Sequence, residues 1–419
     1  MNTFTGIFYV MLAASILVRS GLILRQIRHV RRNREQVPAA FADRIDPMQH
    51  ARAADYSTAQ GRLALWQLAV ETAVLLGLTV LGGIDLLAGW WQGVAVPDLV
   101  RDVGLIASAA LVGTMAEWPL DLYRKFGLEQ RFGFNTMKWR DFVRDLLLQA
   151  LLAALLGLPL LFAVMWIMRH AGALWWLYAW LVWAGFNLLV LAIYPVFIAP
   201  LFNRFVPLDE PGLRSRIETL LARCGFSAQG VYVMDGSRRS RHGNAYFTGF
   251  GRSRRIVLFD TLLQNLLPEQ IEAVLAHELG HFHYHHVIRR LVWMFALSLL
   301  LLWTAALCLD SPWFYAGLHV RHVGAASGLL LFILVLPVFS FPFRALVSML
   351  SRRDEFQADR YAAQQAGAAV LIEALVRLYR DNAATLTPDP WYSMFYDSHP
   401  NAQQRVARLL ALAQEKQPA

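Results

Sequence analysis

Residues 146–168 read LLLQALLAALLGLPLLFAVMWIM, an uncharged and almost wholly apolar run of 23 residues. About 20 helical residues cross the hydrocarbon core of a bilayer, so this run predicts a membrane-spanning helix. Six further apolar runs of 19 to 25 residues occupy 4–24, 63–87, 103–122, 174–197, 291–309 and 323–341. Seven such runs indicate a mainly α-helical integral membrane protein. A large buried helical core is the alternative, but seven runs in one chain count against it.

Composition points the same way. Hydrophobic residues make up 57% of the chain and charged residues 16%, against roughly 45–50% and 25% in soluble proteins. The first run lacks a positively charged start and a small-residue cleavage site, so it is interpreted as a retained span rather than a signal peptide. Cys224 and Cys308 are too few for a disulfide framework, and both are expected to be reduced.

The distribution of basic residues predicts the topology. Loop 25–62 carries eight Arg and loop 123–145 carries six Lys or Arg, whereas loops 88–102, 169–173 and 310–322 carry one Arg each. Because cytoplasmic loops are enriched in Lys and Arg, the N-terminus is expected outside and the C-terminus in the cytosol. Segments 198–290 and 342–419 then also lie in the cytosol. The net charge of +9 comes with no RNA-binding signature, so nucleic acid is not an expected partner.

The chain is expected to divide into four parts. Spans one to five fill 1–197, a cytosolic catalytic segment fills 198–290, spans six and seven fill 291–341, and a cytosolic segment fills 342–419. In the catalytic segment, 212–224 predicts a helix and 231–234, 245–250 and 256–259 predict a small three-stranded sheet, with Gly243, Gly249 and Gly251 at the turns. Pro268 then opens a helix that runs through the 277–281 motif and can continue into span six.

The run His277-Glu278-Leu279-Gly280-His281 is the strongest chemical signal. Positions i and i+4 of a helix share one face, so both imidazoles can bind one Zn²⁺. Glu278 is placed to take a proton from water as general base. The five-residue pattern also recurs by chance, but a helical apolar stripe and a following membrane span strengthen it here.

A catalytic zinc requires a third protein ligand. His283 would face away from the two ligands, His285 lies one turn further along, and a metzincin-type third histidine would fall at Val287. We therefore assign no catalytic role to His283, His285 or His286. Glu355, 74 residues after His281, is the preferred ligand, with Asp359 one turn later to orient a histidine. An amphipathic helix with solvated charges at 355–359 is an equally open interpretation.

Several segments together resemble one family. They are Glu129-Gln-Arg-Phe-Gly-Phe-Asn135, Tyr194-Pro-Val-Phe-Ile-Ala-Pro-Leu-Phe-Asn203, Asn244-Ala-Tyr-Phe247, His277–His281, Glu355–Asp359 and Ser398-His-Pro400. In this order, and over nearly the whole chain, they resemble the type I CAAX prenyl proteases, which are multi-span membrane zinc metallopeptidases. Thr248, where an aromatic residue is common, and Leu267, where a capping Thr is common, depart from the family pattern.

The resemblance implies further features. Seven membrane helices would enclose a water-filled chamber, with one Zn²⁺ near its cytosolic end in a zincin-like α+β part. Asn244 and His399 would stabilise the oxyanion, and Arg405 would brace Glu355. The strand residues that would receive an extended peptide are Ala245, Tyr246, Phe247 and Thr248. Glu71 and Glu117, which lie within predicted spans, are expected to face water or a partner inside the protein; a structural ion pair is equally open for each.

The function predicted from these observations is zinc-dependent peptide hydrolysis by a membrane-embedded endopeptidase. The expected partners are membrane lipid and a peptide or protein substrate, with a lipidated or membrane-bound substrate among the classes considered. One alternative is a heat-shock-type membrane quality-control protease, which has fewer spans. A metal-binding transporter or receptor without peptidase activity, and an inactive scaffold, are others; an intact Glu278 argues against the scaffold. Only three of 39 basic residues are Lys, a bias that suggests a bacterial inner membrane as the location.

Overall fold

The computed structural model describes residues 2–249 and 255–415. Within these residues, seven helical stretches are long and apolar enough to cross a membrane: Thr3–Arg32, Pro47–Leu78, Asp98–Glu129, Trp139–His170, Gly172–Phe202, His286–Leu309 and Ala325–Ala366. Each contains most of one predicted run. The prediction of a mainly α-helical protein with seven membrane helices is therefore confirmed.

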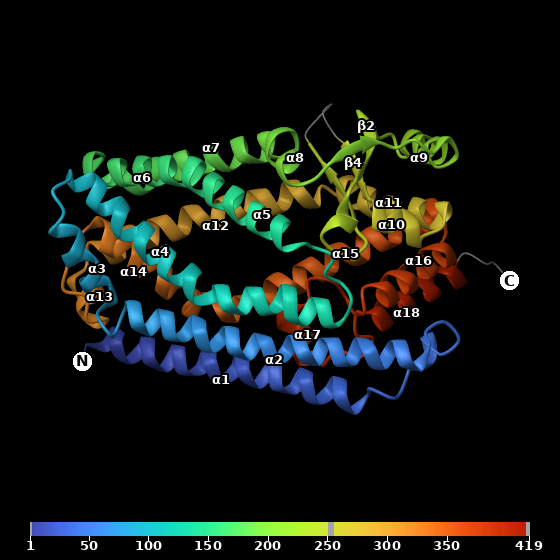
Figure 1. The fold of residues 1–419 in the computed structure, drawn as a ribbon, viewed down its shortest axis with the longest axis horizontal. Helices are drawn as coiled ribbons and strands as arrows, with labels where there is room; N and C mark the ends of the chain where they lie inside the picture. Colours follow the sequence, from blue (N-terminus) through green and yellow to red (C-terminus); the bar gives the residue numbers. More distant parts are fainter. Residues whose placement is uncertain (1, 250–254, 416–419) are drawn as a thin grey trace.

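The helices of the membrane part lie side by side along the long axis of the molecule (Figure 1). Their bounds are α1 (Thr3–Arg32), α2 (Pro47–Leu78), α3 (Gly83–Gln92), α4 (Asp98–Leu122), α5 (Trp139–Leu152), α6 (Leu158–His170), α7 (Trp175–Ile193), α8 (Ala199–Phe202), α12 (His286–Leu309), α13 (Pro312–Gly317), α14 (Ala325–Ser340) and α15 (Arg344–Ala366). Wider π-helical turns, η2 (Tyr123–Glu129), η3 (Ala153–Gly157) and η5 (Tyr194–Ile198), extend α4, α5 and α7. These turns keep the spans continuous past their α-helical ends.

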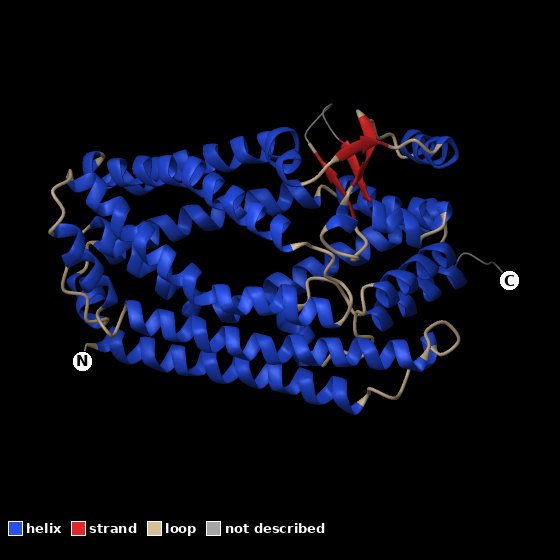
Figure 2. Ribbon diagram, viewed as in Figure 1, coloured by secondary structure: helices blue, strands red, loops and turns tan. Residues whose placement is uncertain are grey.

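A small sheet lies at one end of the helices (Figure 2). Its strands are β1 (Phe205–Pro207), β2 (Gly230–Met234), β3 (Ala245–Thr248) and β4 (Arg255–Phe259), in the order β1-β2-β4-β3. The β2–β4 pair is parallel and the other two pairs are antiparallel. The sheet has a fourth strand, so the prediction of three strands is wrong. The strand β1 was missed because three residues that end in a proline are too short to show an alternating pattern. Phe250 and Gly251, used in that prediction, lie outside the described residues.

The remaining helices lie near the sheet, at the same end as the α1–α2 turn, except α17, which packs against α15 and α1 nearer the middle of the molecule (Figure 1). They are α9 (Pro211–Arg223), α10 (Asp260–Asn265), α11 (Pro268–His283), α16 (Ala368–Asp381), α17 (Pro390–Tyr396) and α18 (Ala402–Glu415). One buried apolar core joins all of these helices except α17 to the sheet and includes Ile217, Leu258, Leu275, Leu371 and Val406. Burial of this core fixes α11 against elements that come from both halves of the chain.

A cavity of about 1030 Å³ lies between this part and the membrane helices. Its wall includes Gln26 of α1, Gln60 of α2, Arg124 of η2 and Tyr396 of α17. Many of these side chains are polar, which is what a water-filled space requires. The expected chamber is present in this form.

The two acidic residues of the predicted spans, Glu71 and Glu117, have different surroundings. Glu71 pairs with Arg19, whose guanidinium lies 2.7 Å from the carboxylate, which supports the structural ion-pair interpretation for Glu71. The Glu117 side chain is exposed on α4. Cys224 and Cys308 are both free, as predicted.

The helix that carries the His277–His281 motif does not continue into the sixth span. It ends at His283, and α12 begins at His286. Between them His285 has a left-handed backbone with φ of 55°, which breaks the helical hydrogen bonding. This break turns His286 back toward α11.

Candidate metal centre and active site

The start of α11 is fixed by its own first turn. Pro268 occupies the first helical position, where its missing N–H removes a donor that would otherwise be unsatisfied. The backbone N–H of Leu267 donates to Oε1 of Gln270 at 3.1 Å, one half of a capping box. The helix is thereby anchored two to four turns before its histidines.

α11 and α15 touch at a position that only glycine allows. A Cβ atom on Gly280 would lie 2.8 Å from the Cα atom of Ala358, closer than carbon atoms pack. Gly280 lies between the two histidines of α11, and Ala358 lies between Glu355 and Asp359 of α15. The close approach of the two backbones therefore brings both sets of side chains together.

Three predicted ligands converge at this contact. Nε2 of His277 lies 3.3 Å from Nε2 of His281 and 3.3 Å from Oε2 of Glu355, and Nε2 of His281 lies 3.4 Å from Oε1 of Glu355. Ligand atoms about 2.0–2.1 Å from one tetrahedral zinc lie about 3.3–3.4 Å apart. Oε2 of Glu355 is buried and has no hydrogen-bond partner among the described residues. The donor set and its spacing fit a zinc ion.

Both carboxylates of α15 are buried. Glu355 and Asp359 are each 3% exposed, so the alternative of a helix with solvated charges at 355–359 is wrong. Burial alone would lower the pKa of His277, but contacts with Asp359 and Glu355 outweigh burial and raise it to about 9. The carboxylates of Asp359 and Glu355 therefore favour a positive charge at this position.

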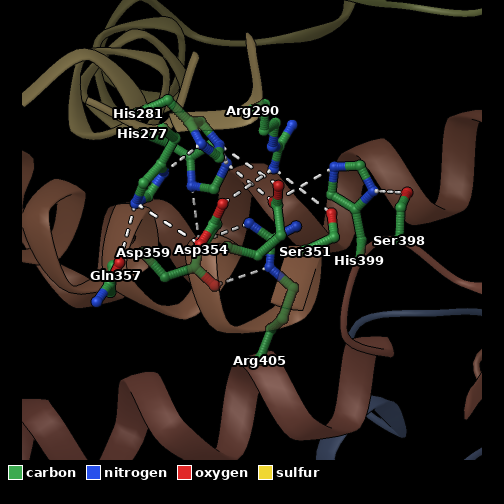
Figure 3. A network of polar contacts seen from close by, with 12 residues as sticks. His277, His281, Arg290, Ser351, Asp354, Gln357, Asp359, Ser398, His399 and Arg405 are labelled. Carbon is green, nitrogen blue, oxygen red and sulfur yellow. Dashed lines mark hydrogen bonds and ion pairs between the residues drawn. The ribbon is translucent and has the colours of Figure 1, made fainter. Parts of the chain in front are cut away.

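Asp359 links His277 to Arg405 (Figure 3). Its Oδ1 lies 2.9 Å from Nδ1 of His277, and Arg405 donates through Nε to Oδ2 at 2.8 Å and through a terminal nitrogen to Oδ1 at 2.5 Å. A proton on Nδ1 of His277 would face this carboxylate and leave Nε2 for a metal. The expectation that Arg405 braces Glu355 is corrected: its planar guanidinium pairs with both oxygens of Asp359 instead.

His281 is oriented by a residue that sequence reasoning missed. Nδ1 of His286 lies 2.9 Å from Nδ1 of His281, and Nε2 of His286 lies 2.9 Å from Oε1 of Gln357. If Nε2 of His286 donates to Gln357, its Nδ1 accepts the Nδ1–H of His281 and leaves Nε2 of His281 free for a metal. In a continuous helix, His286 would lie about 140° around from His281, so only the break at His285 could have revealed it.

The other two histidines lie outside this group. The ring of His283 stacks on Tyr361 with centroids 4.7 Å apart, and His285 forms the break between helices.

Glu278 faces a small pocket of about 180 Å³ beside the predicted metal ligands. The pocket is also lined by His277, Asn244 and His399, so residues from α11, the start of β3 and the segment after α17 meet there. Burial raises the pKa of Glu278, opposed by His277 and reinforced by Glu355. A carboxylate with a raised pKa is a stronger proton acceptor.

His399 and Asn244 approach the centre from separate segments. Nε2 of His399 lies 3.3 Å from Oε2 of Glu355, and Ser398 contacts its other ring nitrogen at 3.0 Å (Figure 3). Oδ1 of Asn244 accepts from the N–H of Ala245 at 2.9 Å. The amide oxygen is thus used locally, which directs the amide NH₂ group to other acceptors.

β3 is an edge of the sheet, because only β4 flanks it among the described strands. Ala245 lines the small pocket. The Phe247 ring packs against Phe226 and Phe282, with centroids 5.5 and 5.4 Å away, and Tyr246 reaches Met234. The larger side chains of β3 are thus committed to packing, and its backbone is the part that remains for pairing.

Residues 26–204 match the family described as "CAAX prenyl protease N-terminal, five membrane helices", and residues 207–413 match "Peptidase family M48". A CAAX prenyl protease 1 homolog of Oryza sativa is 35% identical over 317 residues, which cover 74% of each chain. The chain belongs to the CAAX prenyl protease family of M48 peptidases. It is a membrane zinc metallopeptidase.

Two further members cover almost the whole chain. CAAX prenyl protease 1 of Saccharomyces cerevisiae is 30% identical over 437 residues, 96% of this chain and 94% of the relative. The crystal structure of S. mikatae Ste24p aligns with a TM-score of 0.88 at 29% identity, over 98% of this chain and 99% of that one. The family resemblance inferred from the sequence is confirmed, and the heat-shock-type and transporter alternatives are not favoured.

Proposed function

We propose that His277, His281 and Glu355 hold one catalytic Zn²⁺ and that Glu278 is the general base for peptide hydrolysis. The observation that carries this proposal is the convergence of the three ligand atoms, which all lie within 4.8 Å of one another. When bound, zinc supplies Lewis acidity toward a peptide carbonyl and water. Glu278 accepts a proton from water and returns it to the leaving amine.

Asn244 and His399 are proposed to donate hydrogen bonds to the oxyanion. Both line the small pocket with Glu278, and His399 also contacts the carboxylate of Glu355. Placed at the edge of the pocket, an amide NH₂ and an imidazole N–H offer donors from two sides. Asp359 and Arg405 keep His277 oriented during the reaction.

The substrate is proposed to bind as an extended peptide along β3. Ala245, Tyr246, Phe247 and Thr248 form this edge, and Ala245 lies at the pocket. Backbone pairing with an edge strand gives affinity without selecting a sequence. Side-chain pockets near Glu278 would then supply the selectivity.

We further propose that the site opens to the cytosol and that substrates are membrane-associated peptides or proteins. The Arg-rich loop 25–62 lies at the same end of the molecule as the catalytic part, where Arg25 pairs with Asp389 at 3.0 Å. The positive-inside rule supports the cytosolic assignment. The Arg-rich composition supports a bacterial inner membrane, although the relatives compared above are eukaryotic. The relatives are named for prenylated substrates, and a lipid-modified peptide is one class to test.

The test is a Glu278→Gln substitution in the detergent-solubilised full-length chain. Bound zinc is measured by mass spectrometry, and hydrolysis is measured with an internally quenched peptide, with and without a farnesyl group on its cysteine. The variant should keep wild-type zinc and lose at least about 10²-fold in kcat, because a general base contributes about 10²–10⁴-fold. Glu269→Gln, an exposed glutamate in the first turn of the same helix, is the matched control. A fully active Glu278→Gln protein would exclude this mechanism.

A further inference from the structure

The segment that leads into β3 is held by parts of the chain far from it in sequence. Ser240 forms an isolated antiparallel β-bridge with Asn135, and the N–H of Arg241 donates to the carbonyl of Phe134 at 3.0 Å. Both partners lie in the loop between η2 and α5, which connects two membrane spans. The approach to Asn244 therefore rests on the membrane part of the protein.

His242 is the centre of these contacts. Its Nδ1 lies 3.1 Å from Oδ1 of Asn382, and its Nε2 lies 3.4 Å from Oε2 of Glu129. Its ring stacks on Phe134 with centroids 4.3 Å apart and planes 20° apart. Three sides of the imidazole are thus occupied by three separate segments, which leaves one orientation for the ring.

The two partners of His242 are themselves fixed. Glu129, the last residue of η2, accepts a hydrogen bond from the hydroxyl of Tyr56 in α2. Asn382 follows α16 directly, and its Oδ1 also accepts the backbone N–H of Gly243 at 3.2 Å. His242 is therefore connected through Glu129 to membrane helices, and through Asn382 to the end of α16, a helix that lines the pocket of Glu278.

Asn244 follows this anchored segment by two residues. Its carbonyl accepts the N–H of Phe259 at 3.0 Å, which starts the pairing of β3 with β4. Its side chain lines the pocket of Glu278, as does Asn382. The segment between has no helix or strand of its own, so the contacts of His242 set where Asn244 lies.

We propose that Glu129, His242 and Asn382 are positioning residues that clamp Asn244 and the start of β3 against the metal centre. This inference rests on the proposed function, in which Asn244 donates to the oxyanion. Glu129 and His242 do not line the pocket of Glu278, whereas Asn382 does; all three are proposed to act through the placement of Asn244. Misplacement of a reacting group by about 1 Å can cost about 10²-fold in rate, so loss of the clamp appears in kcat.

The experiment compares two substitutions at Asn382 in the zinc-loaded full-length protein. Asn382→Asp keeps both acceptor contacts and should retain kcat within about threefold of wild type. Asn382→Leu removes them and should lower kcat about tenfold or more, with bound zinc unchanged, on the internally quenched peptide described above. Equal activity of the Leu and Asp variants would overturn the clamp.

A double-substitution cycle separates the clamp from general folding effects. His242→Ala alone should lower kcat about tenfold, but in an Asn244→Ala background it should lower kcat less than twofold further, because its effect passes through Asn244. An undiminished loss in that background would show that His242 does not act through Asn244 and would overturn the proposal. Wild-type kcat in Asn244→Ala alone would overturn the oxyanion role instead, whereas a slow Asn244→Ala protein with a wild-type His242→Ala protein would overturn the clamp alone.

Discussion

Gly280 of α11 lies directly against Ala358 of α15, so closely that a Cβ atom at position 280 would be 2.8 Å from the Cα atom of residue 358. Next to this contact, the side chains of His277 and His281 lie within 3.4 Å of the carboxylate of Glu355. The backbone contact therefore determines the distance between the ligands.

Gly280→Ala is expected to separate the two helices and weaken zinc binding. Backbone cannot yield as a flexible side chain does, so the cost of overpacking is about 1–3 kcal/mol. Zinc per chain and the thermal unfolding midpoint should both fall. Gly185→Ala in α7 is the control, since a Cβ atom there meets nothing within 4 Å. Unchanged zinc content and midpoint in Gly280→Ala would contradict this account of the contact.

The close placement of His277 and His281, whose Nε2 atoms lie 3.3 Å apart, was predictable from sequence because their relation is local. Helical periodicity alone places residues 277 and 281 on one face. Glu355 could be proposed only because a catalytic zinc requires a third protein ligand and the nearby histidines did not fit. Whether 355–359 was buried or solvated depended on the packing of α15 on α11, which periodicity does not contain.

His286 and Arg405 show what sequence could not supply. His286 reaches His281 only because His285 breaks the helix with a left-handed backbone, and no simple composition rule forces a histidine into that conformation. Arg405 lies on α18, and whether its guanidinium contacts Asp359 or Glu355 depends on how α18 packs against α15. The strand β1 was missed because three residues ending in Pro207 carry no periodic signal.

His286→Phe should reduce zinc affinity. The substitution keeps an aromatic ring but removes the acceptor for the Nδ1–H of His281, so that the ligand is no longer held in one tautomer. Loss of such an orienting partner costs about 10–100-fold in metal affinity. Competition for zinc with a chromophoric chelator measures this change.

His283→Phe is the matched control for His286→Phe, because His283 stacks on Tyr361 and has an exposed side chain. Its zinc affinity should equal that of wild type. Equal affinities for both variants would mean that the contact between His286 and His281 has no role in holding the metal.

Arg352 of α15 is expected to support the position of His399. One guanidinium nitrogen donates to the carbonyls of Ser393, Met394 and Asp397 at 2.9, 3.3 and 2.9 Å, at the end of α17 and just before His399. Arg352→Met removes these donors and should lower kcat about tenfold, less than the about 10²–10³-fold loss of an oxyanion donor itself. Steady-state hydrolysis of the quenched peptide measures it.

The neighbouring Arg353 is exposed, and Arg353→Met serves as the control with the same change of charge. A kcat for Arg352→Met equal to that of Arg353→Met would show that the segment before His399 does not depend on Arg352.

In the proposed metal site, a carboxylate from α15 completes the set of ligands begun by two histidines of α11. The most direct test is the zinc content of purified full-length Glu355→Ala protein after dialysis, measured by mass spectrometry beside wild type and a Glu373→Ala control from α16. About one zinc per chain is expected in wild type and the control, and far less than one in Glu355→Ala. Wild-type zinc content in Glu355→Ala would contradict it.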